Sequence, residues 1–171
     1  ANHVDTSPVI VNLVFGSKSG IEDDLRVIDT LQAKFGDDCT KLMFCVDMCQ
    51  FRSEVSLLHE LVSKNVQVMI TGSKFFQAPP FCGALLVPKS LATAVGQCGD
   101  AGVASVYKQI FSAHDFVGPN MAKIAAQLQA FENKGLRTRW EIALDEMEKY
   151  HALSEVVTPS AVTRWRQVVV G

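Results

Sequence analysis

Two neighbouring stretches of the chain end apolar runs with side chains that can do chemistry. Asp47 and Gln50 follow one run, and Thr71, Ser73 and Lys74 follow the next. A carboxylate at the close of an apolar strand is costly to bury unless a cation pairs with it, and a protonated pyridine nitrogen is one such cation. A lysine on a neighbouring strand end can reach an aldehyde on the same ring, while hydroxyls and backbone amides suit a phosphate. The two stretches therefore place a carboxylate, an amine and groups that suit a phosphate at neighbouring strand ends.

A third polar stretch, Gly-Ser-Lys-Ser-Gly at residues 16–20, also follows an apolar run. It lacks the earlier glycine and the Gly-Lys-Ser/Thr order of a nucleotide-binding loop, so a nucleotide site is not expected. An anion-binding helix start close to the other two stretches is one interpretation, and a plain helix cap is the other. Arg52 also has two interpretations, because it can orient a carboxylate or a phosphate, or it can cap a surface helix.

The elements that must position these residues follow from the apolar pattern. Short runs rich in β-branched residues predict strands, and runs at helical spacing predict helices between them. The predicted strands are 9–15, 41–46, 66–70 and 82–87, with helices at 21–35 and 53–63. This alternation predicts a mostly parallel sheet in a three-layer αβα fold, whose ligands bind beyond the carboxyl ends of the strands. Only about seven residues separate Lys74 from the fourth strand, too few for a helical crossover, so that strand is predicted to run antiparallel.

The second half of the chain turns helical. Amphipathic patterns predict helices at 120–132 and 136–153, and a new segment opens near residue 158 and ends in an apolar run at 166–171 that is typical of a strand. We therefore expect the core of a large domain at residues 1–135, and a long linking helix with the start of a small domain at 136–171. The first residue is Ala1, and the last run breaks off inside the expected strand. Both observations favour the central part of a longer protein.

Composition narrows the class of protein. The chain has 171 residues, of which 48% are hydrophobic and 20% charged, as in ordinary globular domains. A net charge of -2 gives no general attraction to nucleic acid or membranes, and no apolar run approaches the ~20 residues that span a bilayer. Five cysteines without framework or metal-site spacing predict free thiols and no metal site. We therefore expect a cytoplasmic or otherwise reducing compartment, with neither nucleic acid nor membrane as a partner.

The order of these residues resembles the core of fold-type I pyridoxal-phosphate enzymes. Asp47-x-x-Gln50, a helix, an apolar strand and residues 71–74 are similar to the family's Asp-x-x-Gln, strand and Ser-x-x-Lys pattern. A loop with Pro79 and Pro80 and the strand at 82–87 resemble the antiparallel return that follows the family's lysine. The likeness is greatest to class V aminotransferases and cysteine desulfurases, and the helix at 136–153 resembles the one that leads to their small domain.

The resemblance implies a role for each residue. Lys74 would form the internal aldimine with pyridoxal 5′-phosphate and later move the substrate's α-proton. Asp47 would keep the pyridine nitrogen protonated, and Gln50 would donate to the phenolic oxygen of the ring. Thr71 and Ser73 would contact the phosphate, although Ser73 stands where class V enzymes often have histidine.

The reaction stays open within this resemblance. It implies a transferase or lyase that acts on an amino acid or an amine by transamination, desulfuration or decarboxylation, and family members are dimers, so a homodimer is expected for the full-length protein. Only about forty residues precede Asp47, and no aromatic among them is well placed to stack on the ring. This chain alone is therefore expected to bind the cofactor weakly and to be inactive. The alternative is a non-catalytic α/β binding module, or a degenerate relative that kept the fold.

Overall fold

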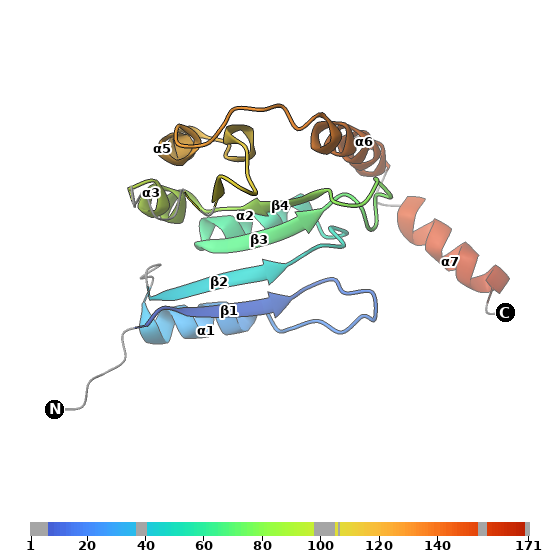
Figure 1. Ribbon diagram of the computed structural model, residues 1–171. Coiled ribbons are helices and arrows are strands. Elements are labelled where there is room, and N and C mark those ends of the chain that lie inside the picture. Colours follow the sequence, from blue (N-terminus) through green and yellow to red (C-terminus); the bar gives the residue numbers. More distant parts are fainter. Residues whose placement is uncertain (1–6, 37–40, 98–104, 106, 154–156, 170–171) are drawn as a thin grey trace.

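The sheet has four strands and is mostly parallel (Figure 1). The computed structural model describes residues 7–36, 41–97, 105, 107–153 and 157–169. The strands are β1 (Val9–Val14), β2 (Leu42–Asp47), β3 (Val66–Thr71) and β4 (Gly83–Leu86), in the order β1-β2-β3-β4. The pairs β1–β2 and β2–β3 are parallel, and β3–β4 is antiparallel. The predicted α/β class, the mostly parallel sheet and the antiparallel fourth strand are thus confirmed.

The two faces of the sheet differ in what covers them. Alternate residues along a strand point to opposite faces, and one such set enters the core with Ile28 of α1 (Arg26–Phe35) and Leu61 of α2 (Val55–Ser63). This set includes Leu13, Val46 and Val68, which are at most 8% exposed. The opposite face leaves apolar side chains in contact with solvent, among them Ile10 at 57% and Val14 at 42% exposure.

Helix α1 begins later than the sequence pattern predicts. The expected helix at 21–35 starts only at Arg26, because two acidic side chains before it bind the backbone near the end of β1. Asp23 Oδ2 accepts a hydrogen bond from the Val14 amide at 2.7 Å, and Glu22 Oε1 accepts one from the Gly16 amide at 3.0 Å. Residues 16–20 therefore form a loop, so the predictions that a helix starts or is capped here are wrong, and a substrate or cofactor contact at this stretch stays a prediction.

The second half contains short helices and two longer ones. They are α3 (Lys89–Gln97), the 3-10 turns η1 (Ala113–Asp115) and η2 (Pro119–Met121), α5 (Ala122–Ala125), α6 (Lys134–His151) and α7 (Val157–Val169). The long helix predicted at 136–153 is confirmed as α6, with Asn133 Oδ1 accepting from the Leu136 amide at 3.0 Å as its cap. No described helix has both the length and the apolar character needed to cross a membrane.

Two predictions for this half are wrong. The helix expected at 120–132 stops after α5, because residues 129–131 pair with another segment: Ser112 Oγ donates to the Phe131 carbonyl at 2.7 Å, and the Ala113 amide donates to the Gln129 carbonyl at 3.0 Å. The strand expected at 166–171 is helical through Val169 within α7. A helix satisfies its backbone locally, whereas a strand needs a neighbour, and the described sheet provides none at this point.

Helix α6 packs against the sheet at a glycine. It lies beyond β4 in Figure 1, and Trp140, Ala143 and Met147 join the core. Ala143 is completely buried, and a Cβ added to Gly72, the first residue after β3, would collide with the Cβ of Ala143 and come within 3.1 Å of Cys82 Sγ. The missing side chain of Gly72 thus sets how closely α6 approaches the end of β3.

We expect Gly72→Ala to lower the free energy of unfolding by roughly 1–3 kcal/mol, because overpacking displaces α6. Gly83→Ala is the matched control, since the nearest atom to its added Cβ would be 3.9 Å away. Combining Gly72→Ala with Ala143→Gly removes the collision, so the double variant should lose less stability than the two single losses added together. Urea unfolding of the four variants measures this, and strictly additive losses would contradict the packing.

Candidate functional site

A cavity of about 360 Å³ opens at the carboxyl ends of the three parallel strands. This is the edge at which open α/β sheets bind ligands, and the volume lies within the range of small-molecule sites. The lining comes from the ends of β1 and β2 and from the turns that follow β1, β2 and β3. It consists of Val14, Phe15, Gly16, Ser17, Lys18, Asp47, Cys49, Gln50 and Lys74.

The structure brings three of the five predicted site residues into this cavity and leaves two outside its lining. Asp47, Gln50 and Lys74 line it, whereas Thr71 and Ser73 do not. Thr71 is 7% exposed, and its hydroxyl donates to the Cys82 carbonyl at 2.5 Å. The same oxygen accepts from the Ser73 amide at 3.2 Å and lies 2.8 Å from the Ser73 hydroxyl. The two hydroxyls hold the turn after β3 together, and their contact with a phosphate stays a prediction.

Asp47 ends β2 as a fixed and ionised carboxylate. Its Oδ1 accepts a hydrogen bond from the Cys49 amide at 2.8 Å, which closes a short turn. Partial burial is the largest single influence on the pKa of Asp47 and raises it, but the hydrogen bonds from Cys49 and the positive charge of Lys74 outweigh burial and hold the pKa below its ordinary value. At neutral pH this strand end therefore presents a negative charge to the cavity.

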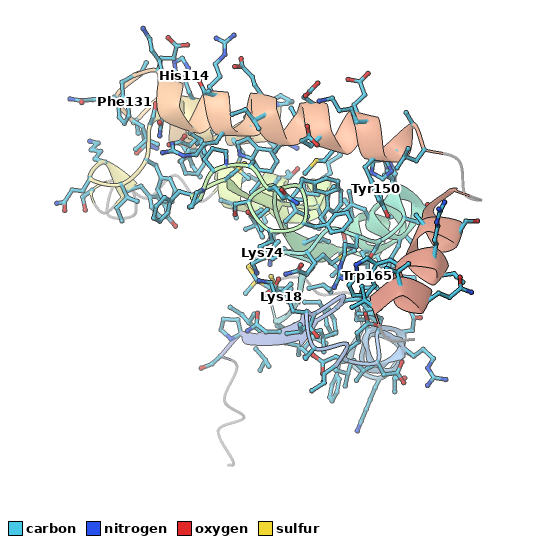
Figure 2. The ribbon with its side chains drawn as sticks, turned by 90° about the vertical axis from the view of Figure 1, so that its right-hand side faces the viewer. Lys18, Lys74, His114, Phe131, Tyr150 and Trp165 are labelled. Atoms are coloured by element: carbon cyan, nitrogen blue, oxygen red, sulfur yellow. The ribbon has the colours of Figure 1, made fainter. Side chains whose placement is uncertain are left out.

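Lys74 lies on a turn that is anchored on both sides. The Gln77 amide donates to the Lys74 carbonyl at 3.3 Å, and the Ala78 amide donates to the Gly72 carbonyl at 3.0 Å. The next residue, Phe75, packs edge-to-face on Tyr150 of α6, with ring centroids 5.2 Å apart. The Lys74 side chain itself is exposed, so its amine is free to meet a ligand from the cavity (Figure 2).

Arg52 ties the loop after β1 to the turn that carries Lys74. Its guanidinium donates to the carbonyls of Gly16 and Ser17, at 3.3 and 3.0 Å. The same group lies over the Phe75 ring at 5.9 Å. Both contacts come from one side chain between β2 and α2, and Arg52 does not itself line the cavity. Of its two interpretations, a surface helix cap is wrong, because the guanidinium binds carbonyls of a distant loop.

The sequence does not predict Phe15 or Cys49 as residues that line the cavity. Phe15 lines it from the end of β1, although no aromatic before Asp47 was expected to be well placed, and it also packs against the core. Its signal was its position as the last apolar residue of the run before Gly16. The sequence predicts Cys49 only as a free thiol, and its position two residues after Asp47 is the signal that places it in the lining. Among the described residues Cys45, Cys49 and Cys82 are free thiols, while Cys39 and Cys98 lie outside the described residues.

Cys49 is protonated at neutral pH. Burial raises the pKa of the Cys49 thiol most, and the hydrogen bond and negative charge of Asp47 raise it further, to about 11. The thiolate is the nucleophilic form of cysteine, so the cavity holds a weak nucleophile at this position.

We expect alkylation of Cys49 by iodoacetamide to be much slower than that of N-acetylcysteine amide at about pH 8, and its rate to keep rising toward about pH 11, because the rate follows the thiolate fraction. Asp47→Asn removes a negative charge and should speed the reaction at about pH 8 without reaching the rate of the free thiol, since burial remains. Peptide mass spectrometry of Cys49 gives both rates. Equal rates in the native chain and in Asp47→Asn would show that Asp47 does not act on this thiol.

Comparison of the chain with known protein families, with curated proteins and with solved structures finds no match. The cavity at the ends of β1, β2 and β3 gathers polar and charged side chains from three separate turns. It combines an ionised carboxylate, Asp47, with two exposed amines, Lys18 and Lys74, and a buried amide side chain, Gln50.

Proposed function

We propose that this chain forms the core of a pyridoxal-phosphate-dependent enzyme that acts on an amino acid or an amine, with Lys74 as the residue that bonds to the cofactor. The observation that carries the proposal is the shared cavity of Asp47 and Lys74, which follow neighbouring parallel strands and are succeeded by an antiparallel strand. The carboxylate suits a cationic ring nitrogen, and the amine suits an aldehyde on the same ring.

The charges of the cavity residues match those of the cofactor. The lowered pKa of Asp47 makes it an anion at neutral pH, which is the form that keeps a pyridine nitrogen protonated. Gln50 is 9% exposed and lines the same cavity, where its amide can donate to the phenolic oxygen. Bound pyridoxal phosphate would supply an electron-withdrawing ring that stabilises negative charge at the substrate's α-carbon. Lys74, as an amine beside that carbon, would accept and return the α-proton.

The reaction type is narrowed by the thiol in the cavity. Desulfuration of an amino acid needs a nucleophilic cysteine, and Cys49 carries a thiol whose pKa is about 11. Transamination or decarboxylation thus fits the cavity better than desulfuration through Cys49. Both need only the proton transfers that Lys74 offers and the ring charge that Asp47 supports.

The finer architecture belongs to the same proposal. A three-layer αβα arrangement would need a further layer over the sheet face that exposes Ile10, Val14 and Leu85. The linking role of residues 136–171 between a large and a small domain, and a homodimer of the full-length protein, are also proposed. The competing function, a non-catalytic α/β module, requires no special reactivity at Lys74.

Reductive trapping separates the two functions. The Lys74 amine would condense with the aldehyde of pyridoxal phosphate and release water, and borohydride would reduce the resulting C=N bond to a stable amine. We expect peptide mapping to find Lys74 modified at lower cofactor concentrations than Lys123, an exposed lysine on α5 at the other end of the sheet (Figure 1).

Asp47→Ala should weaken trapping at Lys74 by about tenfold, because the ring nitrogen loses a charge-assisted partner worth roughly 1.5–3 kcal/mol. Lys123→Ala is the matched control and should leave trapping at Lys74 unchanged. Modification of Lys74 and Lys123 with the same concentration dependence would overturn the proposed function and favour the non-catalytic module.

A further inference from the structure

We propose that Lys18 provides an anion-binding contact of this cavity, for the phosphate of the cofactor or the carboxylate of the substrate. The inference rests on the proposed function for the identity of the ligand and on the structure for the site. Lys18 lines the cavity from the loop after β1, opposite the turn after β3 that carries Lys74 (Figure 2).

The charges of the cavity leave Lys18 as the available cation. Its lining contains the ionisable side chains of Lys18, Asp47, Cys49 and Lys74, and Cys49 is neutral at neutral pH. Asp47 would pair with the ring nitrogen, and Lys74 would be used in the bond to the aldehyde. Among the described residues no ion pair engages Lys18, whereas Lys64 and Lys149 each bind two carboxylates. A phosphate or carboxylate that enters the cavity thus finds one ammonium group without a competing partner.

The Thr71 and Ser73 hydroxyls, which are expected to bind a phosphate, form hydrogen bonds within the protein instead. Thr71 donates to the Cys82 carbonyl and accepts from Ser73, and neither residue lines the cavity. An anionic group in the cavity would then depend on the other side of the lining, where Ser17 and Lys18 lie. This places the anion contact on the loop after β1 in addition to, or in place of, the turn after β3.

The loop that presents Lys18 is held from several directions. Glu22 accepts from the Gly16 amide, Ser17 Oγ donates to the Ile21 carbonyl at 2.5 Å, and Arg52 binds the carbonyls of residues 16 and 17. Gly16 has φ of +73°, a conformation that a side chain disfavours. Because the backbone is fixed by these contacts, less entropy is lost when the Lys18 side chain engages an anion. Arg52 acts here as a positioning residue, since it touches the loop and not the cavity.

The site can be tested without the cofactor. In the full chain, we expect inorganic phosphate to slow acetylation of Lys18 by an amine-reactive ester, with no effect on Lys123, as read by peptide mass spectrometry. The protection should weaken with added sodium chloride, because exposed charges are screened over about 10 Å at 0.1 M salt. Arg52→Ala should reduce the protection, and Arg52→Lys, which can still donate to one carbonyl, should retain more of it. If phosphate changes the acetylation rates of Lys18 and Lys123 to the same extent at every concentration, the proposal is overturned.

Two ligand pairs identify the source of the anion. If Lys18 contacts the phosphate, Lys18→Ala should weaken binding of pyridoxal phosphate about tenfold and leave pyridoxal, which lacks the phosphate, unchanged. If it contacts the carboxylate, both cofactor affinities should stay the same, and the cofactor-loaded protein should bind L-alanine about tenfold more weakly while ethylamine is unaffected. If Lys18→Ala binds each of the four ligands as tightly as Lys123→Ala does, the anion contact is refuted.

Failure of the proposed function would look different. In that case the native chain would show no preferential trapping at Lys74, while protection of Lys18 by inorganic phosphate would persist. The anion site would then stand without the cofactor. Conversely, trapping at Lys74 without protection of Lys18 would leave the enzyme proposal intact and remove Lys18 from the site.

Discussion

The Asp47 carboxylate is held at the end of β2 by the amide of Cys49, at 2.8 Å, and the rest of the cavity is organised around this charge. Burial works against an ionised group at a strand end, and here the hydrogen bonds from Cys49 and the charge of Lys74 overcome it. Burial raises the pKa of the neighbouring Cys49 thiol most, and the hydrogen bond and negative charge of Asp47 raise it further. Parallel pairing of β1, β2 and β3 then delivers the other cavity residues to the same edge.

Three loops form the cavity wall, and their mutual contacts explain why it is ordered. Arg52, which follows β2, reaches the loop after β1 through two carbonyls and the turn after β3 through the Phe75 ring. Phe75 and Phe76 pack on Tyr150 of α6, so the long helix supports the turn that carries Lys74. The absence of a side chain at Gly72 allows α6 to come close enough for these ring contacts. Local order in the site thus depends on Tyr150, which lies 75 residues after Phe75 in sequence.

The sequence predicts the strands well because their apolar runs are local and short. The carboxyl ends of parallel strands lie at the same edge of a sheet, so the sequence pattern alone predicts that Asp47 and Lys74 lie close together. The start of α1 could not be predicted from the sequence pattern. Glu22 and Asp23 are residue types that favour the first turn of a helix, and only their hydrogen bonds to the backbone near the end of β1 keep them outside α1. The prediction for the end of α5 was wrong for a similar reason, because the Ser112 hydroxyl donates a hydrogen bond to the Phe131 carbonyl, nineteen residues away in sequence.

The site was predicted in part, and the missing part has a physical cause. A hydroxyl such as that of Thr71 serves a phosphate or a carbonyl equally well, and its partner, the Cys82 carbonyl, is set by the antiparallel return of β4. Residue types alone therefore cannot show which hydroxyls face the cavity. Lys18 was equally ambiguous, because its place in the lining depends on the loop that Arg52 and Glu22 hold.

The central claim is that the Asp47 carboxylate and the Lys74 amine share one cavity and act on each other. An NMR titration of the Asp47 side-chain carboxyl tests this most directly, in the native chain and in Lys74→Met, which keeps the length of the side chain without its charge. We expect the pKa of Asp47 to lie below its ordinary value of 3.8 in the native chain and to rise in Lys74→Met, because the favourable charge is lost. A native pKa of Asp47 at or above 3.8, or a pKa that does not change in Lys74→Met, would contradict it.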